Sequence, residues 1–165
     1  MSKENNRDNN KEKFSLGLAV FDFLPVALFG IAAFIIGIKL GSILFALGAV
    51  ICIIGGMGKV LWKILIAVKD KDIPFLAVLL RICLPAGFAL MVIGTIIADK
   101  TIRASLWSGV MSVPSLIFFI LGIVGIAGMV ICAAKMDKYD VKANLIEQII
   151  NSFAQGFVLI GVLFL

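Results

Sequence analysis

Five long apolar runs, separated by short polar segments, account for nearly all of the chain after its first residues. Each run is long enough to cross the roughly 30 Å hydrocarbon core of a bilayer as a helix. Helix is the form in which a single segment can pair all of its backbone groups in lipid. The pattern predicts an all-α integral membrane protein, a bundle of five transmembrane helices. The spans are expected at residues 14–38, 43–68, 74–98, 109–134 and 145–165.

Proline and turn residues refine the ends of these spans. Asp22 and Pro25 interrupt the first run near its start, so residues 14–22 are expected to lie at the interface before the helix enters the membrane. Residues 39–42 are predicted to form a short turn. Pro74 stands where a helix would begin, since proline is favoured in the first helical turn. Residues 99–108 are expected to be a polar connection.

Small residues recur at helical spacing in the second and fourth spans. Such stripes first of all predict packing surfaces, because they let helix backbones approach closely. They could also serve as docking surfaces for another membrane protein. Short similarities between spans suggest a hairpin unit in which span one pairs with span two and span three with span four. The stripes comprise Gly48, Cys52 and Gly55 in the second span and Gly122, Gly125 and Gly128 in the fourth.

The distribution of cations predicts the orientation. Residues 1–13 are polar and poor in core-forming side chains, and they are expected to be a disordered cytoplasmic tail. With the N-terminus inside, ten Lys and Arg side chains lie on the inner side and three on the outer, with Lys59 and Arg81 inside the membrane. Cytoplasmic loops carry such an excess, so the N-terminus is predicted to be cytoplasmic and the C-terminus outside.

Composition narrows the function classes. A hydrophobic fraction of 62% excludes an ordinary soluble domain, for which roughly 45–50% is usual. The formal net charge of +5 arises from cations that flank apolar runs, so no nucleic-acid partner is expected. Histidine is absent and the three cysteines are isolated in different spans. The sequence therefore indicates no metal site, no cofactor and no nucleophile–base pair, and it leans against an enzyme.

Polar residues within the spans point to one place. At about 1.5 Å per residue, Asp22, Lys59, Arg81 and Asn151 each lie about 10–13 Å from the inner end of their helices. Gln155 lies deeper on the fifth span, at the end of a polar stripe with helical spacing. Because charged groups in hydrocarbon usually pair or line a cavity, these five residues are the predicted ligand-binding site.

The expected electrostatics of this site are net positive. Asp22 is predicted to pair with Lys59 or Arg81, either as part of a binding site or as a purely structural ion pair. Trp62 and Lys63 are interpreted as interface anchors. Three further polar residues of the fifth span are interpreted as an interfacial first turn: Asn144, Glu147 and Gln148.

Three hypotheses about function follow. The first is a transporter or permease-type binder of an anionic small molecule or a lipid headgroup, through a cytoplasm-facing polar site. The second is a non-catalytic membrane subunit or assembly partner, or a homo-oligomer, that docks through glycine-rich faces. An intramembrane enzyme ranks third. Membrane lipids are the expected surroundings, and a composition rich in Lys, Asn and Ile leans towards a bacterial cytoplasmic membrane.

Overall fold

The computed structural model describes residues 16–69, 71–135 and 141–165, and these are helical apart from short connections. The helices are α2 (Leu16–Phe21), α3 (Phe23–Leu40), α4 (Ile43–Lys69), α5 (Pro74–Ile97), α6 (Lys100–Val110), α7 (Val113–Lys135) and α8 (Val141–Leu163). Within the described residues, five helical stretches are long and apolar enough to cross a membrane: Gly17–Leu40, Ile43–Lys69, Pro74–Ile97, Val113–Cys132 and Lys142–Leu163. The predicted all-α architecture with five apolar spans is confirmed. The tail predicted at residues 1–13 lies outside the described residues.

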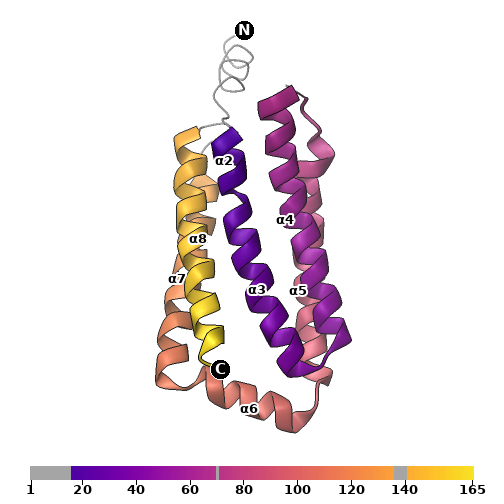
Figure 1. Cartoon of the computed structure of the whole chain (residues 1–165), viewed down its shortest axis with the longest axis vertical. Coiled ribbons are helices and arrows are strands. Elements are labelled where there is room, and N and C mark those ends of the chain that lie inside the picture. Colours follow the sequence, from indigo (N-terminus) through magenta and orange to yellow (C-terminus); the bar gives the residue numbers. More distant parts are fainter. Residues whose placement is uncertain (1–15, 70, 136–140) are drawn as a thin grey trace.

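Helix α3 stands between two helical hairpins. One hairpin is α4 with α5 and the other is α7 with α8, and α3 packs against α4 on one side and α8 on the other. Helix α6 runs across one end of the bundle and joins the two hairpins (Figure 1). Helix α2 starts at the opposite end of the bundle from the end of α8 (Figure 1). This open arrangement leaves a cavity at each end of α3.

Small residues hold each hairpin together. A Cβ atom added to Gly48 of α4 would lie 2.5 Å from the carbonyl oxygen of Gly87 in α5. In the second hairpin, a Cβ on Gly122 of α7 would lie 2.6 Å from Cγ2 of Val158 in α8. Real Cβ atoms essentially never approach so closely, so α4 and α5 touch through their backbones at Gly48, and the Val158 side chain packs directly on the α7 backbone at Gly122. The glycine stripes therefore serve as packing surfaces inside the chain, as first expected.

Proline explains the break that places Asp22. Pro25 has no N–H to offer the carbonyl of Phe21, and its ring disfavours a continuous helix there. Helix α2 accordingly ends at Phe21 and α3 begins at Phe23, with Asp22 in the turn between them. Pro74 occupies the first turn of α5. The predicted interruption at Asp22 and Pro25 and the predicted helix start at Pro74 are confirmed. Gly41 ends α3 with a left-handed φ of 59°, within the predicted turn.

The polar connection predicted at residues 99–108 is instead a helix. Asp99 caps α6, because its side chain accepts hydrogen bonds from the backbone N–H groups of Thr101 and Ile102. The fourth span consequently starts at Val113 rather than Gly109. The predicted pairing of spans three and four as a hairpin is wrong, since α6 separates α5 from α7 and carries them to opposite sides of α3.

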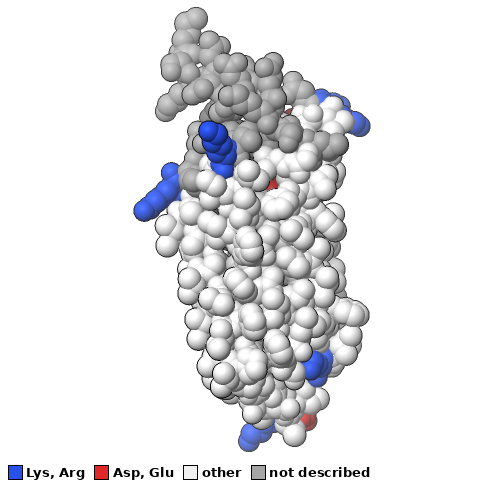
Figure 2. All heavy atoms as spheres, turned by 60° about the vertical axis from the view of Figure 1, so that its left-hand side comes forward, with Lys and Arg blue, Asp and Glu red and all other residues white. Residues whose placement is uncertain are grey.

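The surface fits a membrane-embedded protein. On the face shown in Figure 2, a broad uncharged band separates Lys and Arg side chains that gather at the two ends. Many large apolar side chains of the described helices are exposed, including Phe34 of α3 at 69% and Val124 of α7 at 63%. Exposure of such an apolar surface to water is unfavourable, whereas lipid tails solvate it.

Candidate functional site

A cavity of about 220 Å³, lined by both apolar and polar residues, lies near the end of the bundle where α2 begins. Four of the five predicted site residues line it: Asp22, Lys59, Asn151 and Gln155. They come from the α2–α3 break, from α4 and from α8. Three separately anchored elements therefore direct polar groups into one space, as the depth argument predicted.

Arg81, the fifth predicted residue, does not line this cavity. It is exposed on α5, whereas the cavity is lined on that helix by Leu80, Leu84 and Phe88. These three residues are four apart and share one face, and each step along a helix turns about 100°. Arg81 follows Leu80 directly and so points away from that face. Depth alone could not fix this rotation.

Asp22 forms a buried ion pair with Lys63, and the predicted partners Lys59 and Arg81 are wrong. Both side chains are nearly inaccessible, with Asp22 exposed by 3% and Lys63 by 1%. The register between α2 and α4 selects the partner, because Leu18 packs on Ile66 and the next turn of each helix brings residues 22 and 63 together. The interpretation of Lys63 as an interface anchor is also wrong.

Lys59 pairs instead with Glu147 of α8. Its Nζ lies 2.9 Å from Oε1 of Glu147, and both side chains are partly accessible at 27% and 19%. Both residues line the cavity, so this ion pair forms part of its wall. Glu147 had been interpreted as part of an interfacial first turn. Its position one helical turn before Asn151 was the signal that it shares the cavity face.

The paired charges change the electrostatics that the sequence suggested. Two cations, Lys59 and Lys63, meet two carboxylates, Asp22 and Glu147. With Arg81 outside, the cluster is balanced rather than net positive. Among the described residues of this site, the charge excess inferred from the sequence is therefore not found.

Amide groups complete the polar lining. Gln148, Asn151 and Gln155 follow one face of α8 along the cavity wall. Asp22 adds an acceptor, since its Oδ1 is buried and receives no hydrogen bond from the described part of the chain. A buried acceptor of this kind is costly unless a donor reaches it. The cavity thus offers both donors and acceptors to a polar molecule.

Within the described residues, no group of three or more His, Cys, Asp or Glu side chains could hold a metal ion. The three cysteines are free thiols, and Cys52 lines the cavity at its apolar end. Comparison with known proteins finds no matching family model, no matching curated protein and no matching solved structure.

Proposed function

We propose that this protein is a permease-type binder of a small polar solute, which it holds in the cavity between α3, α4 and α8. The observation that carries the proposal is the Lys59–Glu147 ion pair in the wall of a cavity inside the bundle. Charged residues at membrane depth are costly and typically mark substrate or ion pathways. An interfacial anchor would point to the headgroups, whereas both of these side chains face a shared interior space.

The balanced charges favour a solute that carries both signs. A simple anion at Lys59 would displace Glu147 and leave its carboxylate without a counter-charge in a poorly hydrated site. A zwitterion can replace both halves of the pair at once, with its anionic group at Lys59 and its cationic group at Glu147. The proposal thus moves from the anion expected from the sequence to a small zwitterion.

The orientation belongs to this proposal. We place the polar cavity on the cytoplasmic side of a bacterial membrane, on the strength of the cation count along the sequence. In this orientation, solute reaches the cavity from the cytoplasm. The proline-interrupted start of α3 is then the segment beside the opening at which helix bending is least costly.

The assembly-partner alternative has lost part of its support. Its docking faces were the glycine stripes of spans two and four, and Gly48, Gly55, Gly122 and Gly125 all contact a neighbouring helix within the chain. Solute binding needs no such surface. It therefore accounts better for a cavity with paired charges and amides.

Thermal stability of the purified protein in detergent tests the proposal. A solute that binds only the folded state raises the unfolding midpoint, and the midpoint continues to rise with the logarithm of the solute concentration above its dissociation constant. Glycine betaine and glutamine are the zwitterionic probes, and succinate and inorganic phosphate are the anionic ones. We expect a concentration-dependent rise of the midpoint with at least one zwitterion and none with the anions.

The double substitution Lys59→Met with Glu147→Met removes both charges without leaving an unpaired one, and it should abolish the shift. Lys39→Gln is the matched control, since Lys39 is exposed in the last turn of α3, outside the cavity. A shift that survives the double substitution, or one given by the anions alone, would contradict the proposal.

A further inference from the structure

A second and larger cavity lies at the other end of α3. It has a volume of about 570 Å³ and is enclosed by the ends of α3, α5 and α8, by α7 and by the crossing helix α6. Of its eleven lining residues, all but Thr95, Lys100 and Arg103 are apolar. Its size falls within the range of ligand-binding cavities in proteins.

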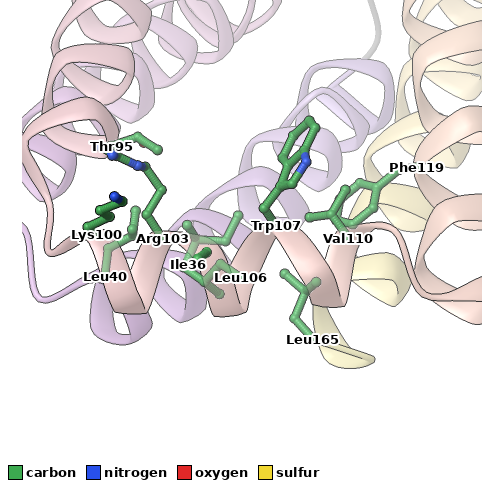
Figure 3. A pocket seen from close by; sticks show the side chains of 11 residues that line it. Ile36, Leu40, Thr95, Lys100, Arg103, Leu106, Trp107, Val110, Phe119 and Leu165 are labelled. Atoms are coloured by element: carbon green, nitrogen blue, oxygen red, sulfur yellow. The ribbon is translucent and has the colours of Figure 1, made fainter.

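The polar and apolar parts of this cleft are separated. The nitrogen atoms of Lys100 and Arg103 lie at one end, and the rings of Trp107 and Phe119 lie at the other (Figure 3). A molecule that fits must therefore present an anionic group at one end and an apolar body along the rest. Neither water nor a free anion meets both requirements.

The position of α6 indicates that the cleft lies at the interface between the lipid headgroups and the hydrocarbon core. Helix α6 follows the end of the α5 span and crosses the end of the bundle, with Lys100 and Arg103 in its first turn and Trp107 further along. Cationic and tryptophan side chains on a short helix are typical of the interface between headgroups and hydrocarbon. The cleft therefore starts at headgroup level and extends towards the hydrocarbon core.

The charges at this end leave room for a phosphate. Asp99 is adjacent, but its carboxylate accepts the N–H groups of Thr101 and Ile102. The negative charge of Asp99 and the positive charges of Lys100 and Arg103 sum to one net positive charge at this end of the cleft. Arg103 donates to the carbonyl oxygen of Ile96, and a guanidinium carries five donors, so this bond leaves others for phosphate oxygens.

We propose that the cleft binds one membrane phospholipid, with its phosphate at Lys100 and Arg103 and an acyl chain beside Trp107 and Phe119. Water in the apolar part would find too few hydrogen-bonding partners to be stable there. An acyl chain is as apolar as the leucine side chains that line the cleft, so it packs against them favourably. The bound lipid joins the two hairpins where protein contacts between them are sparse.

Tryptophan fluorescence tests this site directly, because the chain contains only Trp62 and Trp107. In a Trp62→Phe protein, Trp107 is the sole reporter. Phosphatidylglycerol with brominated acyl chains is titrated into the protein in non-ionic detergent, and each reading is divided by that for unbrominated lipid. We expect quenching that saturates at one lipid per chain.

Substitutions then separate the headgroup contact from the chain contact. Lys100→Gln with Arg103→Gln should raise the half-saturating lipid concentration about tenfold. Lys135→Gln, in the last turn of α7 and away from the cleft, should leave it unchanged. Ala104→Phe fills the cleft without removing a charge and should lower the saturating amplitude.

Quenching that rises without saturation, or is the same in all three variants, would overturn the proposal. Displacement of the lipid by inorganic phosphate alone would overturn the chain contact. Neither result bears on the Lys59–Glu147 cavity, since none of these substitutions touches it.

Discussion

The two ends of α3 meet the rest of the protein in different ways. At one end, Asp22 at the start of α3 pairs with Lys63 of α4, and Lys59 of α4 pairs with Glu147 of α8. At the other end, α6 crosses between the hairpins beside a largely apolar cleft. The comparison teaches that the same helix is fixed by specific polar partners at one end and by non-directional apolar contacts at the other.

This difference predicts that substitutions at the two ends of α3 will lower the stability of the protein by unequal amounts. Polar pairs in a low-dielectric interior are costly to break one partner at a time. Apolar contacts weaken in proportion to the area lost and tolerate exchange of one apolar group for another. Disruption should therefore be severe at the ion-paired end and mild at the cleft.

The largest effect is expected for Lys63→Met. It leaves Asp22 buried at 3% exposure without its counter-charge, so the free energy of unfolding should fall by about 3–5 kcal/mol. Equilibrium unfolding by SDS in mixed micelles measures the loss. Adding Asp22→Leu to the same protein removes the orphaned charge and should recover most of the stability. An equal loss in the single and double variants would show that packing, not charge, dominates this end.

A smaller effect is expected where α4 meets α5. Gly48→Ala places a methyl group 2.5 Å from the carbonyl oxygen of Gly87, which overpacks the interface and should cost about 1–3 kcal/mol. Gly156→Ala is the matched control, because a Cβ at Gly156 meets nothing within 4 Å. The same unfolding titration compares them. Similar stabilities would contradict the close approach of the two backbones.

The Lys59–Glu147 pair should contribute less than the buried pair. Its partly accessible side chains suggest a coupling of up to about 1 kcal/mol in a double-mutant cycle of Lys59→Gln and Glu147→Gln. Solute binding, measured by the thermal shift, should fall much further than stability. A coupling as large as that of Asp22 with Lys63 would mean that the pair is structural.

The smallest effect concerns Asp99 and α6. The backbone N–H group of Thr101, followed by that of Ile102, holds the pKa of Asp99 below its usual value of 3.8. The cap therefore contributes fully above that value and is lost as the pH falls through the lower, folded-state pKa. Protection of the α6 amides from hydrogen exchange should decline over this acidic range. Asp99→Asn, which caps without titrating, should show no such decline.

Much of the fold could be predicted from hydrophobic pattern alone. Span lengths, the break at Asp22 and Pro25 and the start at Pro74 all follow from local chemistry, which depends little on neighbouring helices. Helix α6 was missed because its mixture of polar and apolar residues resembles a loop in a chain dominated by apolar runs. Its signal was Asp99, two and three residues before the N–H groups that it caps.

The site was harder to predict because it depends on rotation and register. Depth along each helix placed Asp22, Lys59, Arg81 and Asn151 in one layer, and the polar stripe on the fifth span added Gln155. All of these except Arg81 line one cavity. Depth could not show that Arg81 turns outward. It also could not show that the packing of Leu18 on Ile66 sets Asp22 beside Lys63. Those facts arise from contacts between helices, which a single sequence does not contain.

The backbone contact between Gly48 and Gly87 also limits how this molecule can move. Helices that touch at that distance have no layer of flexible side chains on which to slide, so α4 and α5 must travel as one rigid body. At Gly122 and Gly125, the side chains of Val158 and Ala154 pack directly on the α7 backbone, so α7 and α8 are also closely joined. Any opening or closing is then a rigid-body rotation of the α4–α5 hairpin relative to the α7–α8 hairpin. The side-chain contacts of α3 with α4 and with α8 are where this rotation takes place.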